Sequence, residues 1–418
     1  MRPAARRRWL LLHRGVGLLV GVVLIVIGAT GALMAFEDEI VAILNRNVRR
    51  VPVRDAALLD PPQLLARLRD AEPNRRVVAL ELPRTHGAAV RVTWEDAQPE
   101  SSGSRSLKRS ARYVDPYTAA SLADEGTRGE AFFAGARSLH RWLVLGDLGS
   151  RDLGRQAVGA CTLALVLLAL SGLGLRCRLP LRFGVDLGWR ARGRARLFRP
   201  HVAIGTWALP VYFAVAATGL SWTYPAYLDT LHWLAGVERP ARGERRGEEV
   251  SALEPSLDLA WLAAAKLLPA PPGLVRIRLP RGDGPVRVSH LAPQAPHSQA
   301  YDTLTLDLAG TVLEDRRYGE QSLAERLLSS RLALHTGAYF GGIGRALVCL
   351  GALSLPVVVG TGVWLYVLGY ARRRGSSVRG ERPTDLRPER ESEGGLALET
   401  SPASVTAPLG TRVGTTLR

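Results

Sequence analysis

Cysteines and nucleotide-binding motifs are both scarce in this chain of 418 residues. Two of its three cysteines, Cys161 and Cys349, lie inside long apolar stretches, and Cys177 begins a basic segment. None of the three can cross-link a domain in an oxidising exterior, so a disulfide framework is excluded. Two Gly-x-Gly sequences, at 172–174 and 360–362, also lie inside apolar stretches rather than between a strand and a helix. The sequence therefore contains no dinucleotide-binding fingerprint.

Charged side chains are absent from four stretches of at least twenty residues. These stretches are residues 15–36, 156–175, 202–228 and 346–371. About twenty apolar residues in a helix cross a hydrocarbon core of about 30 Å. A cleaved signal peptide has a shorter apolar run than the first stretch, and three further spans follow, so we expect the first span to be retained. The chain is predicted to be an integral membrane α-helical protein with four transmembrane helices.

Arginine is concentrated in the short segments beside these spans. Five arginines and no acid lie in residues 1–14, and eight arginines face the single acid Asp186 in residues 176–200. Because short cytoplasmic segments carry the excess of positive charge, we expect both termini in the cytoplasm and residues 37–138 and 229–334 outside. The net charge of +17 is explained by orientation and by contact with anionic lipid, which argues against a nucleic-acid partner.

The chain is built from one unit, a span, an exterior segment and a span, used twice. Thr30-Gly31 follows His13 by seventeen residues, and Thr218-Gly219 follows His201 by the same number. The matching pairs in the second and fourth spans are Ser171-Gly172 and Thr361-Gly362. Small residues let helices approach closely, and hydroxyls can bond to their own turn, so we interpret these four pairs as helix-packing positions.

The two exterior segments have the same predicted secondary structure. Each contains one helix, at 61–71 and at 257–268, followed by short alternating strands. We therefore expect two small α+β domains, each with one helix on an antiparallel sheet.

The C-terminal tail has few apolar residues and is predicted to be disordered. The predicted order is a basic N-terminus (1–14), the first span (15–36), the first exterior domain (37–138), a histidine motif with the second span (139–175), a basic loop (176–200), the third span (201–228), the second exterior domain (229–334), a histidine motif with the fourth span (335–371) and the tail (372–418).

Histidine motifs precede the spans, and their order resembles a known family. The motifs are Leu12-His13-Arg14 before a span that ends in Thr-Gly-Ala-Leu-x-x-Phe, Leu139-His140-Arg141-Trp142 before the second span, and Leu334-His335-Thr336-Gly337 before the fourth. In this order they resemble the PepSY-associated transmembrane family, which includes inner-membrane ferric-siderophore reductases and iron-regulated membrane proteins. The third span departs from the pattern, because it opens Arg-Pro-His201 without the neighbours seen elsewhere. The resemblance implies a bacterial inner membrane, PepSY-like exterior domains and four histidines that bind two b-type haems.

The residues also support haem binding without the resemblance. A b-type haem held by two histidines needs no Cys-x-x-Cys-His attachment motif, and the sequence has none. His13 and His201 both belong to cytoplasmic ends and are expected to form an inner site. His140 and His335 both belong to exterior ends and are expected to form an outer site, as in helix bundles with cofactors between facing helices. Anchoring at the membrane interface would explain one such histidine, but four at equivalent places favour ligation.

Arg14 and Arg141 directly follow two of these histidines. Their guanidinium groups could bind haem propionates through charge-assisted hydrogen bonds. Orientation of the span or contact with lipid phosphate explains them equally well. The other histidines are at positions 86, 232, 290 and 297, and they lack the spacing of a zinc site, so we expect them to be solvated or locally bonded.

These features predict a haem-dependent oxidoreductase that passes electrons across the membrane. The donor would be a quinol or a separate reductase, because the sequence has no dinucleotide fingerprint. The acceptor would be a ferric siderophore or another exterior compound, which makes the protein a ferric-chelate reductase. A non-enzymatic PepSY regulator of an exported protease is the alternative. A transporter is disfavoured, because no span carries a buried acid or lysine along a pathway.

Overall fold

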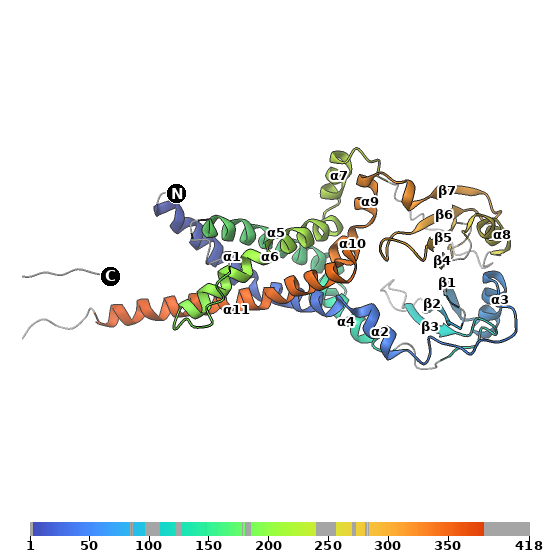
Figure 1. The fold of residues 1–418 in the computed structure, drawn as a ribbon, viewed down its shortest axis with the longest axis horizontal. Coiled ribbons are helices and arrows are strands. Elements are labelled where there is room, and N and C mark those ends of the chain that lie inside the picture. The colour runs from blue at the N-terminus through green and yellow to red at the C-terminus, as the bar shows by residue number, and fades with distance from the viewer. Residues whose placement is uncertain are drawn as a thin grey trace, which may run out of the picture. The chain divides into compact units, whose positions relative to one another are not determined.

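The computed structural model describes residues 3–83, 85, 87–96, 109–122, 128–146, 148–177, 179, 185–239, 256–269, 273–280, 282 and 284–379. These residues form long helices and an antiparallel sheet (Figure 1). His86 and the tail beyond residue 379 lie outside this part of the chain.

Four long apolar helices confirm the predicted spans. They are α1 (Pro3–Met34), α5 (Arg151–Arg176), α6 (Ala195–Thr223) and α11 (Gly341–Arg379). Each is long and apolar enough to cross a bilayer. The protein is therefore a multi-pass membrane protein with four candidate spans.

Two of these helices end at different residues from those predicted. α6 ends at Thr223 rather than at residue 228, because Tyr224 precedes a proline and that position disfavours the helical region. Tyr224 is extended, with φ −113° and ψ 103°, and Pro225 opens the next helix, α7 (Pro225–Leu234). α11 continues to Arg379, so residues 372–379 are helical where the sequence predicts a disordered tail.

Short helices lie between the sheet segments and the second and fourth spans. In the first repeat they are α4 (Glu130–Trp142) and the 3₁₀ turn η1 (Leu143–Gly146). In the second repeat they are α9 (Leu323–Ser329), α10 (Arg331–Thr336) and η4 (Ala338–Phe340). His140 lies in α4 and His335 in α10, so each precedes its span, as the order of the motifs predicts. Leu143 and Gly337 have φ of 54° and 78°, and these left-handed residues interrupt the helix after each histidine.

The strands of both repeats form a single antiparallel sheet in the order β3-β2-β1-β4-β5-β6-β7. The strands are β1 (Arg75–Leu82), β2 (Val90–Asp96), β3 (Arg109–Val114), β4 (Leu274–Arg278), β5 (Val286–Leu291), β6 (Asp302–Leu306) and β7 (Val312–Arg316). The sequence predicts two separate domains, but β1 and β4 pair with each other, and Leu80 lies opposite Ile277. An exposed strand edge carries unpaired backbone groups, and this pairing satisfies the edges of both repeats at once.

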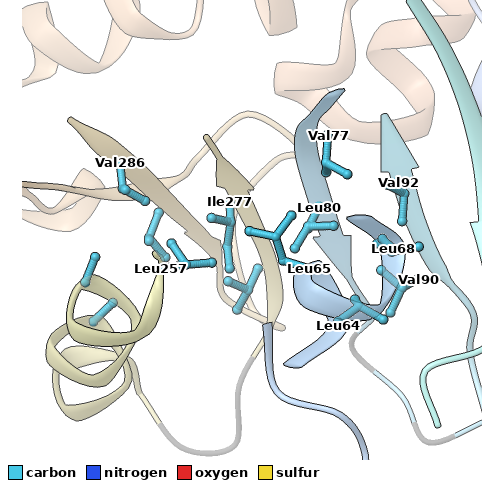
Figure 2. Packing of buried hydrophobic residues seen from close by; sticks show 14 of the residues in the cluster. Leu64, Leu65, Leu68, Val77, Leu80, Val90, Val92, Leu257, Ile277 and Val286 are labelled. Carbon is cyan, nitrogen blue, oxygen red and sulfur yellow. The ribbon is translucent and has the colours of Figure 1, made fainter. Parts of the chain in front are cut away.

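One hydrophobic cluster spans both halves of the sheet. It is covered by α3 (Pro61–Ala71) and α8 (Asp258–Leu267), one helix from each repeat. Figure 2 shows Leu64, Leu65 and Leu68 of α3 among the buried side chains of the strands. α3 begins where the sequence predicts, because Asp60 and Gln63 form a reciprocal capping box and Pro61 occupies the first turn. The two repeats therefore share one core in this region.

A second cluster lies within the four spans. Its buried members are Val20, Leu24, Leu165, Ala208, Tyr212 and Leu355, which come from all four long helices. The Tyr212 hydroxyl lies 2.6 Å from Ser354 Oγ, between α6 and α11. Polar groups inside a bilayer need partners from the protein itself, and this pair provides one. In α1 the cluster residues lie between His13 and Thr30, so apolar side chains separate the two ends of the bundle.

Two further helical segments complete the described chain. They are α2 (Glu37–Leu44), which follows α1, and the 3₁₀ turn η3 (Tyr318–Glu320), which follows β7.

Candidate functional site

Four histidines come together in two pairs. The ring centroids of His13 and His201 are 6.2 Å apart, with an angle of 90° between the ring planes. The centroids of His140 and His335 are 6.3 Å apart, at 72°. These are the same pairs as in the sequence-based prediction. Each pair takes one histidine from each repeat.

Every one of these histidines contacts a hydroxyl on the other long helix of its own repeat. The Nδ1–Oγ distances are 2.9 Å for His13–Ser171, 3.1 Å for His140–Thr30, 3.1 Å for His201–Thr361 and 2.9 Å for His335–Thr218. The hydroxyls are those of the four Ser/Thr-Gly pairs. Within each repeat, two such bonds therefore run in opposite directions between the helices.

The partners of Nδ1 decide which ring nitrogen carries the proton. His140 Nδ1 lies 3.0 Å from the Ile27 carbonyl oxygen, and a carbonyl can only accept. His201 Nδ1 likewise lies 3.0 Å from the Val358 carbonyl oxygen. Nδ1 is therefore the donor in these two rings, and in His13 and His335 it contacts a hydroxyl that donates its own proton elsewhere. In a neutral imidazole the other nitrogen, Nε2, then keeps its lone pair.

The hydroxyl groups fit this assignment, because their own protons are directed elsewhere. Thr30, Thr218 and Thr361 each donate to the carbonyl oxygen four residues earlier, at 2.7 Å. Ser171 donates to the Leu168 carbonyl oxygen at 3.1 Å. Each hydroxyl oxygen can then accept from Nδ1. Such a bond orients an imidazole and raises the basicity of its other nitrogen.

The two histidines that lie outside the spans are neutral at pH 7. Burial lowers the pKa of His140. Burial, together with the neighbouring His140, lowers the pKa of His335 to about 4. Neutral imidazole is the form that binds a metal, so both rings are in the ligand state without any further change.

The glycine of each Ser/Thr-Gly pair provides space for the same histidine ring. A Cβ atom placed on Gly172 would lie 3.3 Å from His13 Cε1, and one on Gly31 would lie 3.2 Å from His140 Cε1. The corresponding distances are 3.2 Å for Gly362 and His201, and 3.6 Å for Gly219 and His335. The sequence-based interpretation of these pairs as packing positions missed this role. The equal seventeen-residue spacing marks the pairs of the first and third spans as equivalent, but it does not show which histidine each pair contacts.

A cavity of about 350 Å³ adjoins the first histidine pair. Both His13 and His201 line it, and its walls include leucines and valines from all four long helices. Four arginines also line it, namely Arg6, Arg14, Arg176 and Arg194. This volume lies within the range of small-molecule pockets, about 300–1,000 Å³. An apolar cavity with several cations suits a ligand that is largely apolar and carries acidic groups.

The two arginines singled out in the sequence have different surroundings. Arg14 lines the cavity beside His13. The guanidinium of Arg141 lies over the Trp142 ring, 4.8 Å from its centroid. Burial lowers the pKa of Arg141, and nearby Arg137 lowers it further. The cavity lining also contains Arg6, Arg176 and Arg194, which sequence reasoning did not select.

The second pair is enclosed by aromatic and glycine-rich segments. The Trp222 ring meets the His335 ring edge to face, with centroids 5.2 Å apart. Gly337, two residues after His335, has a φ of 78°, and a Cβ there would lie 2.2 Å from the Gly344 carbonyl oxygen. Only glycine fits this close approach of two backbones. The turn after α10 therefore depends on Gly337.

The family comparison agrees with the histidine motifs. Residues 10–368 match a family described as the PepSY-associated TM region. The chain belongs to this family. The match covers both histidine pairs and the sheet, so the resemblance is confirmed. A comparison with curated proteins finds no match.

The three other histidines that the structure of this PepSY-associated protein describes are buried rather than solvated. His290 is 1% exposed, and its Nε2 accepts the Gly273 N–H at 3.0 Å. His297 bonds to the Tyr318 hydroxyl at 2.8 Å, and His232 is also buried. The prediction of local bonding therefore holds for His290 and His297. Among the described residues, no group of three or more His, Cys, Asp or Glu side chains is placed to hold a metal ion.

The tautomer assignment makes a prediction for ¹⁵N NMR of histidine-labelled protein prepared without metal or cofactor. His335 should be neutral with its proton on Nδ1 at pH 7, and should take up a second proton only as the pH falls to about 4. The resonance that disappears in the His335→Gln variant is thereby assigned to His335. A midpoint near the ordinary value of 6.5 would contradict the burial argument.

Proposed function

We propose that this protein binds two b-type haems, one between His13 and His201 and one between His140 and His335. The supporting observation is the ring spacing, together with the lone pair on each Nε2. A metal–imidazole nitrogen bond is about 2 Å long, and roughly 1 Å separates that nitrogen from the ring centre, so two rings on one metal lie about 6 Å apart. The centroid separations of 6.2 and 6.3 Å agree with this value.

The cavity beside the first pair has the chemistry that such a group needs. Haem is a broad apolar ring with two carboxylates, and the cavity combines apolar walls with arginines. Arg14 lies in α1, Arg176 in α5 and Arg194 directly before α6, so they could bind carboxylates from several sides. These residues therefore fit haem b at the first site, and Arg141 is our candidate for a propionate contact at the second.

Bound haem would supply reversible one-electron chemistry. The protein's part is to hold the ligands and to set their electronic properties. The hydroxyls of Ser171, Thr30, Thr361 and Thr218 each accept a hydrogen bond from Nδ1–H and so fix the ring orientation. Hydrogen bonding to the ligand and exclusion of water are two of the means by which a protein tunes a haem potential.

We infer an orientation with both termini in the cytoplasm of a bacterium and the protein in its inner membrane. This orientation follows from the arginines beside the spans. It places the His13–His201 pair toward the cytoplasm and the His140–His335 pair toward the exterior. Two ligand pairs at different depths divide an insulating core of about 30 Å into shorter distances, which suits electron transfer across the membrane.

The proposed reaction is reduction of an exterior ferric siderophore or a similar acceptor. The electrons would come from a quinol or a separate reductase on the cytoplasmic side. Reduction to ferrous iron would weaken a chelate built for ferric iron, and iron would be released. The sheet, formed by residues that the orientation places outside, is the region where such an acceptor would meet the protein.

The haem proposal predicts about two haems per chain in a pyridine haemochrome assay. His13→Ala or His201→Ala should remove one haem and leave the other, because each pair ligates a separate iron. The control is His290→Ala, which removes a buried histidine from the sheet and should leave both haems. A colourless protein from haem-replete cells would contradict the proposal and favour the protease regulator.

The glycine contacts predict a selective effect of one methyl group. Gly172→Ala places a carbon 3.3 Å from His13 Cε1, so the ring must move. Overpacking of this kind costs about 1–3 kcal/mol, so haem affinity at the first site should fall by about five- to 150-fold. Gly174→Ala is the matched control, because nothing lies within 4 Å of its Cβ. Equal haem affinities in the two variants would argue against a ring position set by Gly172.

The proposed reaction predicts that ferric siderophores reoxidise the chemically reduced protein in membranes. His335→Ala should slow this reaction by at least about tenfold, since it removes a ligand of the site nearest the exterior. Stopped-flow spectroscopy at the haem bands measures the rate. If only acceptors without iron reoxidise the protein, it is not a ferric-siderophore reductase, and the proposal of electron transfer across the membrane remains.

A further inference from the structure

A buried histidine outside the two pairs connects the sheet to the helix of His335. His297 lies between β5 and β6 and is 7% exposed. Its Nδ1 accepts the Gln299 N–H at 3.2 Å, so in the neutral ring Nε2 carries the proton. That nitrogen lies 2.8 Å from the Tyr318 hydroxyl and 3.2 Å from Ser330 Oγ. Tyr318 and Ser330 are themselves 3.2 Å apart, so the three groups form a closed triangle.

The triangle contacts both ends of α10. Ser330 is completely buried and is the residue directly before this helix. Tyr339, three residues beyond its end, places its ring 4.8 Å from the His297 ring, with an angle of 33° between the planes. His335 lies between these two contacts. On the sheet side, the Tyr318 N–H donates to Asp302 Oδ1 of β6 at 2.8 Å.

α10 needs such contacts because it is short. It has six residues, and a helix of this length has little stability of its own. α4, which carries His140, has thirteen residues and is also held by ion pairs of Arg137 with Glu37 and of Arg91 with Glu130. The orientation of His335 therefore depends on tertiary contacts more than that of His140 does.

A nucleophilic role for this cluster does not fit its geometry. Nε2 of His297 is a donor, so it cannot accept a proton from Ser330 as the base of a catalytic pair does. The serine is also completely buried, so a substrate has no access to it.

We propose that His297 is a positioning residue for His335. Through Tyr318 and Ser330 it ties the start of α10 to strand β6, and through Tyr339 it supports the segment after α10. The ligand geometry of the His140–His335 pair then depends on the sheet, where the proposed acceptor would bind. This inference rests on the proposed haem at that pair.

The test compares variants of the full-length haem protein in a spectroscopic redox titration. In His297→Leu the potential of the haem at His140–His335 should shift, while that of the haem at His13–His201 stays unchanged. His297→Gln keeps an N–H donor and should restore the potential in part. Tyr318→Phe, which removes one hydroxyl, should shift it in the same direction as His297→Leu. Tyr117→Phe is the control, because it removes a buried tyrosine hydroxyl that accepts the Arg54 N–H in the first repeat and makes no bond to Asp302 or α10 among the described contacts.

Amide hydrogen exchange provides a readout that needs no haem. In His297→Leu the amides of residues 332–336 should exchange about five- to tenfold faster, as expected for the loss of about one buried hydrogen bond. Tyr117→Phe should leave them unchanged. Unchanged exchange and unchanged potentials in both His297→Leu and Tyr318→Phe would overturn the inference. A wild-type protein without haem would instead refute the proposed function, and the exchange experiment would still decide whether His297 holds α10.

Discussion

A histidine ring that is packed between helices has to place its N–H on an acceptor from the protein, because an unpaired N–H that is shielded from water is costly. The two spans of the first repeat meet this requirement reciprocally. His13 of α1 donates to Ser171 of α5, and His140, ahead of α5, donates back to Thr30 of α1. The two bonds lie at opposite ends of the helix pair, so they set how far one helix can slide along the other. α6 and α11 are fixed in the same way by His201 and His335.

The same contacts leave each Nε2 available, and each ring lies beside a ring of the other repeat. Both histidine pairs combine one ring from each half of the chain, and the sheet is joined through one strand from each half. Neither repeat can complete a site or cover its own strand edge. The same constraint therefore holds in the bundle and in the sheet, because each half of the chain needs the other half to complete its histidine pairs and to pair its edge strand.

Much of this arrangement could be predicted from the sequence, because it depends on composition and topology. The apolar stretches predicted the spans, and the arginines with the alternation of spans predicted which histidines share a pair. The hydroxyl partners could not be predicted, because Thr30 and His140 are 110 residues apart and their contact depends on the helix register. The union of β1 with β4 depends likewise on how two edges meet in space. His297 was passed over because it lies in a proline-containing loop, where burial does not show in the sequence.

The relation between the halves is close to that of a symmetric dimer within one chain. His13 corresponds to His201, His140 to His335 and β1 to β4, so each junction joins a residue or strand to its own counterpart. In a dimer of identical halves, any substitution would alter both partners of a junction at once. Because the two halves here are parts of one chain with different sequences, a substitution alters only one partner of a junction. One member of each pair can acquire its own neighbours while the other stays as it was, and the short α10 with its buried His297, opposite the longer α4, is such a divergence.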